Sequence, residues 1–273
     1  MQLFHKKLND MFTKKQVVKI ISGIDNTNFN VILKYIKTCE MSNATYIDII
    51  ANPNIVSIVK NITNIPICVS SISVKALYDC VQAGADIIEI GNFDSFYNEG
   101  IILSASQILA MAKQARTLFP YIDICVTIPY TLKLEQQVML AVQLEKIGIN
   151  IIQTEGKLIQ ANNNINNYKN DLYDSICYAS LALSSVYYLS QFINIPIIAS
   201  SSINSVNAPF ALAYGASGIG IKSAISNLSS IKEMSSYINE IICSFDINII
   251  DNSYEYQSIN GHMENLIDDV LLV

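Results

Sequence analysis

The sequence predicts an α/β fold, a closed parallel (β/α)8 barrel (TIM barrel), and two observations lead to it. The first is an internal repeat, in which a strand, a serine turn, a helix and a second strand with a Gly-Ala start occur twice. The copies span Ile65–Gly91 and Ile195–Ser223, and Gly84 of the first matches Gly215 of the second at an offset of 131 residues. Such a repeat is typical of barrels whose loops after strands 3/4 and 7/8 hold phosphate groups.

The second observation is that eight short runs of β-branched residues alternate with helical patterns, which indicates a parallel sheet covered by helices. The expected strands are Val17–Ile24, Thr45–Ala51, Ile65–Ser71, Ala85–Asn92, Ile122–Ile128, Ile149–Glu155, Ile195–Ser201 and Ser217–Ser223. The helices expected to follow them are 28–42, 53–62, 73–83, 104–118, 131–147, 172–191, 204–214 and 228–243. The glycines at three of the helix ends fit C-terminal caps, namely Gly84, Gly148 and Gly215.

The length of 273 residues suits one barrel domain over residues 1–243, followed by a tail over 244–273. Within 1–16 the apolar residues share one helical face, so we expect a helix that caps the bottom of the barrel. We expect the amphipathic tail to pack on the barrel or on a sister subunit, which leaves a homo-oligomer open. The Asn-rich segment Lys157–Asp171 is either a lid over the active face or, as we favour, an insertion without a role.

Composition excludes several classes of function. A net charge of −6 with Arg116 as the single arginine argues against nucleic acid as a partner. His5 and His262 lie near the two ends, which argues against a histidine-ligated metal or a Ser-His-Asp triad in the barrel, and no cofactor is expected. The uncharged stretch Ser175–Ile221 is interrupted by serines and Pro196, so no membrane span is expected. The six cysteines form no C-x-x-C pair and are expected to be reduced and buried.

Three charged residues stand within apolar strands, namely Lys19, Asp48 and Glu89. The outer face of a barrel strand packs under helices, so these side chains are expected to point into the lumen. A desolvated lysine can act as a nucleophile or base beside a carboxylate, and we therefore predict these three as catalytic. An internal ion-pair network that holds the barrel together is an equal alternative. Asp123 starts its strand and is expected to be structural.

Polar residues at the carboxyl ends of the strands are expected to contact the substrate, because barrel active sites form there. These predicted substrate-binding residues are Ser22, Asn52, Asn92, Thr127, Gln153 and Glu155. The small residues after strands 7 and 8 are predicted to bind phosphate together with a lysine, as the set Ser201, Ser202, Lys222 and Ser223. A glycine is expected in place of Lys222, so this lysine either adds a cation to the site or marks a site that has been lost.

Several blocks of the sequence resemble one family: YIDIIANP, IPICVSSI, AGADIIEIGNFDSFY, CVTIP, GINIIQTEG and NAPFALAYGASGIGIKSAI. This is the family of the twenty-third hypothetical chloroplast reading frame, encoded in algal plastid genomes with relatives in cyanobacteria and plants. The resemblance covers Lys19 to Ile225 and implies a barrel fold and a plastid (stromal) location, which fits the absence of a transit peptide. The chain departs from the family pattern at Tyr130, where histidine is frequent, and at Ser202 and Lys222, where glycine is usual.

More distantly, the strand 7/8 block is similar to barrels that act on phosphorylated sugars and vitamin precursors, such as sugar-phosphate epimerases and thiamine-phosphate synthases. The resemblance implies a stromal protein that binds phosphate or a small phosphorylated metabolite. The first hypothesis is a lyase, isomerase or synthase. The alternatives are a non-catalytic metabolite-binding or regulatory barrel, and a structural scaffold without an anion site.

Overall fold

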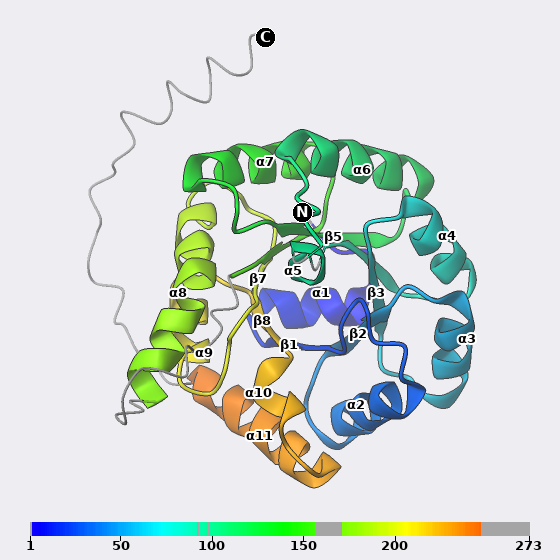
Figure 1. Cartoon of the computed structure of the whole chain (residues 1–273), viewed down its shortest axis with the longest axis vertical. Coiled ribbons are helices and arrows are strands. Elements are labelled where there is room, and N and C mark those ends of the chain that lie inside the picture. Colours follow the sequence, from blue (N-terminus) through cyan, green and yellow to red (C-terminus); the bar gives the residue numbers. More distant parts are fainter. Residues whose placement is uncertain (1, 92, 98, 157–170, 247–273) are drawn as a thin grey trace.

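A computed structural model shows a closed barrel of eight parallel strands in which β1 pairs with β8 (Figure 1). The structure describes residues 2–91, 93–97, 99–156 and 171–246. The strands are β1 Val17–Ile21, β2 Tyr46–Ile50, β3 Ile67–Ser71, β4 Ile87–Ile90, β5 Asp123–Ile128, β6 Ile151–Thr154, β7 Ile197–Ala199 and β8 Gly218–Ile221. The predicted fold class is confirmed, and each strand lies within the run expected for it.

Helices surround the barrel and shield the outer face of the strands (Figure 1). They are α2 Phe29–Met41, α3 Pro53–Ile62, α4 Val74–Gln82, α6 Ala105–Leu118, α7 Leu134–Lys146, α8 Asp171–Leu189, α9 Ala208–Ala213 and α11 Ile231–Cys243. Helix α9 begins later than expected because the Asn204 side chain accepts hydrogen bonds from the N–H groups of Val206 and Asn207, which holds a turn there. The sequence did not predict the short helices α5 Asp94–Tyr97 and α10 Ser223–Ser226.

Local chemistry fixes where the helices begin and end. Ser104 and Ser230 each form a capping box with the residue three positions later, which satisfies first-turn N–H groups. Gly84 and Gly215 both have φ +107°, a conformation that other residues rarely adopt. A Cβ atom on Gly215 would also lie 2.5 Å from the Cβ of Ser190, so two constraints require glycine at this end of the repeat.

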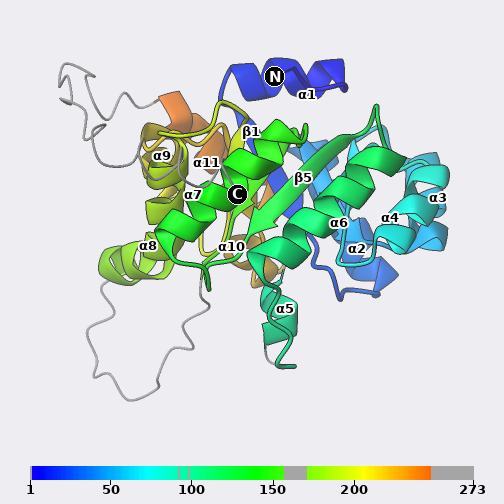
Figure 2. The same ribbon diagram turned by 90° about the horizontal axis from the view of Figure 1, so that it is seen from above.

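The end of the barrel at which the strands begin, its bottom, is closed by the predicted cap helix, α1 Lys6–Thr13. Figure 2 shows this helix at the top of the view, on the side opposite α5. Leu8 and Phe12 of this helix pack against an apolar layer of the lumen made by Val17, Tyr46, Cys68, Ile87, Cys125, Ile151 and Ile198. The Asp123 carboxylate accepts hydrogen bonds from the N–H groups of Phe4 at 3.0 Å and His5 at 2.9 Å. Asp123 therefore anchors the N-terminal segment, as its position at a strand start suggested.

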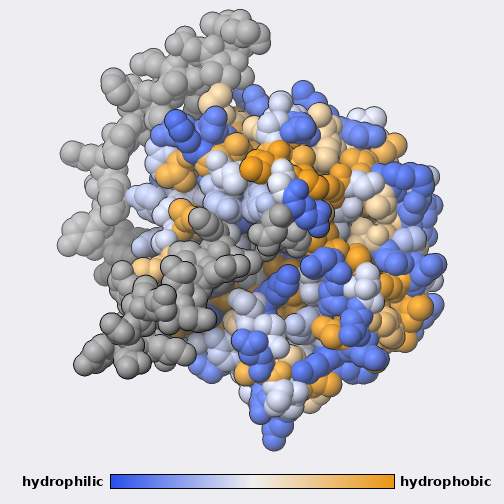
Figure 3. Space-filling view, in the orientation of Figure 1, coloured by the Kyte–Doolittle hydropathy of each residue, from blue (hydrophilic) through white to orange (hydrophobic). Residues whose placement is uncertain are grey.

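The surface at the opposite end is a mosaic of hydrophilic and hydrophobic residues (Figure 3). Among the described helices, none is long and apolar enough to cross a membrane. Of the predicted tail, only a 3-10 turn at Ser244–Asp246 is described, and residues 247–273 lie outside the described part of the chain. The same holds for residues 157–170 of the Asn-rich segment, so the lid and tail hypotheses stay predictions, as does the single domain over 1–243.

We predict that Asp123→Ala lowers the free energy of unfolding by about 1–3 kcal/mol, because two N–H groups lose their acceptor. Asp79→Ala is the matched control, since Asp79 forms an exposed pair with Lys75 on α4 and its loss should change stability by less than about 1 kcal/mol. Urea unfolding of both variants measures the difference. Equal losses would show that Asp123 does not anchor the N-terminal segment.

Candidate functional site

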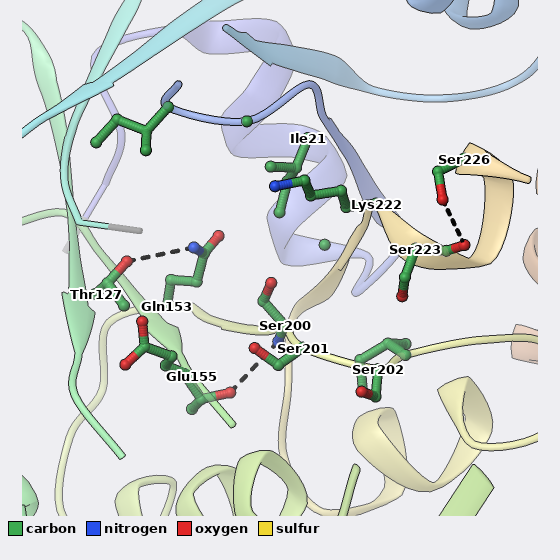
Figure 4. A pocket seen from close by; sticks show the side chains of 15 residues that line it. Ile21, Thr127, Gln153, Glu155, Ser200, Ser201, Ser202, Lys222, Ser223 and Ser226 are labelled. Carbon is green, nitrogen blue, oxygen red and sulfur yellow. Dashed lines mark hydrogen bonds between the residues drawn. The ribbon is translucent and has the colours of Figure 1, made fainter. Parts of the chain in front are cut away.

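A cavity of about 190 Å³ opens at the carboxyl ends of the strands, on the side of β1, β6, β7 and β8 (Figure 4). Its wall includes Ile21, Gly23 and Ile24 of the β1 end and Ser200 and Ile203 of the β7 end. Seven predicted site residues also line it: Thr127, Gln153, Glu155, Ser201, Ser202, Lys222 and Ser223. The structure thus brings part of the predicted substrate set and the whole predicted phosphate set to one place.

Beneath this cavity, the charged strand residues meet in the lumen. The Lys19 ammonium donates hydrogen bonds to Glu89 and, at 2.9 Å, to Oε1 of Gln153, and it lies 3.3 Å from Oδ2 of Asp48. All four side chains are buried, with 0–1% of each residue exposed. The inward orientation expected for the three charged residues is therefore what the structure shows.

The second oxygen of Glu89 ties this network to the wall of the cavity. Glu89 Oε1 accepts hydrogen bonds from Thr127 Oγ1 at 2.9 Å and from Gln153 Nε2 at 2.8 Å. Asp48 accepts a further bond from Ser70 Oγ at 2.6 Å. Thr127 and Gln153 thus belong to both the buried network and the pocket, whereas Lys19 is not among the residues that line the cavity.

The pKa of Lys19 is relevant to its two predicted roles, catalytic nucleophile or base and partner in an ion-pair network. Burial alone lowers the pKa of this lysine, but the carboxylates of Asp48 and Glu89 outweigh that effect and hold its pKa well above the usual value. A Schiff-base nucleophile must lose its proton before it attacks. The contacts of Lys19 with Glu89, Gln153 and Asp48 are those of the ion-pair alternative, and both roles stay predictions.

The turn after β7 has an unusual backbone. Ser201 and Ser202 have φ +77° and +57°, and such left-handed conformations cost a non-glycine residue about 1–2 kcal/mol. The buried Asn207 holds the turn by donating its Nδ2 to the carbonyl oxygen of Ser202 at 2.9 Å. Strain of this kind is concentrated at ligand sites, and it explains why glycine is expected at position 202.

Lys222 does not need to be glycine for conformational reasons, because its φ is −132°. Its ammonium lies over Gly23, where an added Cβ atom would be 3.0 Å from Lys222 Nζ and 3.1 Å from Asp25 Oδ1. Figure 4 shows the lysine side chain beside Ile21 at the pocket wall. Among the described residues that line the cavity, Lys222 is the only cation and Glu155 the only carboxylate.

Glu155, just after β6, is held by a group that the sequence did not reveal. Its Oε2 accepts hydrogen bonds from the hydroxyl of Tyr97 at 2.5 Å and from the N–H of Tyr130 at 3.4 Å. The two tyrosine rings meet edge to face, with centroids 5.3 Å apart. Burial, and then the charge of Glu155, raises the pKa of Tyr97 well above its usual value, so the phenol stays a donor. The only sequence signal for Tyr97 is the aromatic run after the fourth strand.

Two of the predicted substrate-binding residues that the structure describes, Asn52 and Ser22, do not line the cavity. Asn52 caps α3 by accepting hydrogen bonds from the N–H groups of Asn54 and Ile55, at 3.0 Å and 3.3 Å. Ser22 Oγ accepts a bond from Asn26 Nδ2 at 2.8 Å. Asn92 lies outside the described residues. In the described ranges no group of three or more His, Cys, Asp or Glu residues is placed to hold a metal ion.

A protein-family model matches the chain over nearly the whole barrel. The model described as "Protein of unknown function (DUF561)" matches residues 4–250. The chain belongs to the DUF561 family.

Two curated relatives illustrate the family. The chain is 51% identical over 248 residues to "Uncharacterized protein ycf23" of Antithamnion sp., covering 89% of this chain and 90% of that protein. It is 40% identical over 240 residues to the protein of the same name from Cyanophora paradoxa, covering 87% of this chain and 96% of the relative. These relatives are plastid-encoded, so the resemblance and the plastid location are both confirmed.

Solved structures share the fold. Thiamine phosphate pyrophosphorylase from Pyrococcus furiosus has a TM-score of 0.55 and 17% identity, covering 85% of this chain and 97% of that one. The 3-hexulose-6-phosphate synthase from Salmonella typhimurium has a TM-score of 0.57 and 11% identity, covering 84% of this chain and 99% of that one. At these identities the likeness shows the barrel fold alone.

We predict that Lys19→Met lowers the free energy of unfolding by roughly 3–5 kcal/mol, because it leaves two buried carboxylates without their cation. Adding Glu89→Gln should recover part of this loss, and a double-mutant cycle measured by denaturant unfolding gives the coupling. Lys75→Met, at an exposed pair with Asp79, is the control and should cost less than about 1 kcal/mol. Unchanged stability of Lys19→Met would instead favour a catalytic lysine.

We predict that Ser202→Gly stabilises the protein by about 1 kcal/mol, because glycine has no Cβ atom to oppose the left-handed backbone. The same substitution at Ser180, inside α8, should destabilise by about 1 kcal/mol, since glycine is a poor helix former. The denaturant midpoints of the two variants, each compared with that of the parent protein, test both predictions. A Ser202→Gly variant that is less stable than the parent would show that its serine side chain matters more than its backbone.

Proposed function

We propose that this protein binds a small phosphorylated metabolite in the cavity above β6–β8, with the phosphate at Lys222 and the Ser201–Ser202 turn. One observation carries the proposal: the only cation among the described lining residues lies on the same side of the barrel as two successive left-handed serines. Backbone N–H groups in such turns form concave sites for anions. Serine side chains are small enough to let a phosphate approach that backbone.

The names of two structural neighbours support this ligand class. One is called a thiamine phosphate pyrophosphorylase and another a 3-hexulose-6-phosphate synthase, and both share the barrel. The finer proposal is a lyase, isomerase or synthase of the plastid stroma. Glu155 is the acid-base group best placed for such a reaction, because it faces the cavity whereas Lys19 lies beneath it.

A non-catalytic metabolite-binding or regulatory barrel is the second candidate, and the contacts of Lys19 favour it. The ammonium contacts Glu89, Gln153 and Asp48, and the two carboxylates, those of Glu89 and Asp48, stabilise its protonated form. Incubation with a bound sugar phosphate in D2O separates the candidates. An enzyme that moves a proton on carbon incorporates deuterium into the ligand, which NMR detects, whereas a binding protein does not.

We predict that inorganic phosphate raises the thermal unfolding temperature of the protein, since a ligand at 100 times its Kd adds about 2.7 kcal/mol of stability. Lys222→Gln should weaken phosphate binding about tenfold or more, because it removes the cation. Lys113→Gln is the control, at an exposed position of α6 outside the barrel. The anion site is refuted if phosphate leaves unfolding unchanged, or if the two variants bind phosphate equally.

A further inference from the structure

We propose that the ligand carries hydroxyl groups beside its phosphate, that Glu155 accepts hydrogen bonds from those hydroxyls, and that Tyr97 positions Glu155 for this contact. This deepens the proposed function and rests on it, because it assigns the part of the same cavity that lies away from Lys222.

The charges of the cavity are divided between two walls. Figure 4 shows Glu155 on the side of Thr127 and Gln153, with Lys222 and Ser223 on the other side. A phosphate is attracted to the ammonium and repelled by the carboxylate, so it takes the Lys222 side. An ionised carboxylate only accepts hydrogen bonds, and the group that suits the other wall is therefore a neutral donor such as a hydroxyl.

Tyr97 acts on this wall through Glu155, because it is not among the residues that line the cavity. Its hydroxyl donates to Oε2 of Glu155 at 2.5 Å from α5, and the N–H of Tyr130 reaches the same oxygen at 3.4 Å. Only 3% of the Glu155 residue is exposed, so the donors that contact its carboxylate hold its orientation, and the Tyr97 hydroxyl is one of them. The phenol keeps its proton, since burial and the neighbouring carboxylate both raise its pKa.

The size of the cavity narrows the ligand class further. A volume of about 190 Å³ is small beside the roughly 300–1,000 Å³ typical of sites for drug-sized molecules. A phosphate and a chain of a few hydroxylated carbons fit this space. The inferred ligand class is a short polyol phosphate.

Glycerol phosphate and propyl phosphate provide a matched pair of probes, since they share the phosphate and the carbon count and differ in the hydroxyl groups. Titration calorimetry should show glycerol phosphate binding about tenfold more tightly, as expected for a hydrogen bond to a charged group. Glu155→Gln and Tyr97→Phe should each bring the ratio of the two affinities, glycerol phosphate to propyl phosphate, close to one. Neither substitution should weaken the binding of inorganic phosphate. Tyr121→Phe, at an exposed residue next to Phe4, is the control and should keep the ratio.

The outcomes separate this inference from the function on which it rests. Equal affinity of the parent protein for the two organic probes overturns the hydroxyl contact and leaves the phosphate site standing. A ratio lost in Glu155→Gln but kept in Tyr97→Phe overturns the positioning role of Tyr97. Failure of all three probes to bind the parent protein refutes the proposed function itself.

Discussion

Lys19 places a positive charge in the lumen of the barrel, where water does not solvate it. Removing a charge from water costs several kcal/mol, and only close partners offset that cost. The partners are Glu89 on β4, Asp48 on β2 and Gln153 on β6, so one ammonium connects four strands across the lumen. The carboxylates also need hydrogen-bond donors, and Thr127 on β5 donates to Glu89. The polar centre of the barrel follows from this single requirement.

The network divides the barrel into two ends with different roles. Below it the lumen is apolar and closed by α1, whose segment Asp123 anchors, so this end serves stability. Above it Gln153 and Thr127 present polar atoms to a cavity whose wall also includes the strained serine turn after β7 and Lys222 after β8. The strained turn after β7 and Lys222 after β8 lie opposite Glu155, which follows β6, and this arrangement is the basis for proposing a ligand site here. The buried ionic network of Lys19, Asp48, Glu89 and Gln153, which we call the ionic floor, thus lies next to the polar pocket and shares Gln153 with it.

The sequence predicted most of this architecture, because barrel strands must be apolar on the outside and any charge in them must turn inward. That rule placed Lys19 and Glu89 in the lumen without a structure. The rule did not reveal that the Lys19 ammonium would contact Glu89, Gln153 and Asp48 at once. The distances between these side chains depend on the stagger between the strands, which the sequence does not give. Asn52 shows a second limit of prediction from sequence. A polar residue at the end of a strand can be a substrate ligand or the N-cap of the next helix, and Asn52 is the N-cap of α3. Tyr97 was missed because α5 is four residues long and has no periodicity to detect.

The most direct test of the account is a crystal structure of the protein grown with glycerol phosphate. We expect the phosphate to lie within hydrogen-bond distance of the Ser201–Ser202 backbone and of Lys222 Nζ, with the hydroxyl groups toward Glu155. Lys19 should remain bound to Glu89 beneath the ligand. A phosphate bound elsewhere on the barrel, or a covalent bond between Lys19 and the ligand, would contradict the division of the barrel into an ionic floor and a binding site above it.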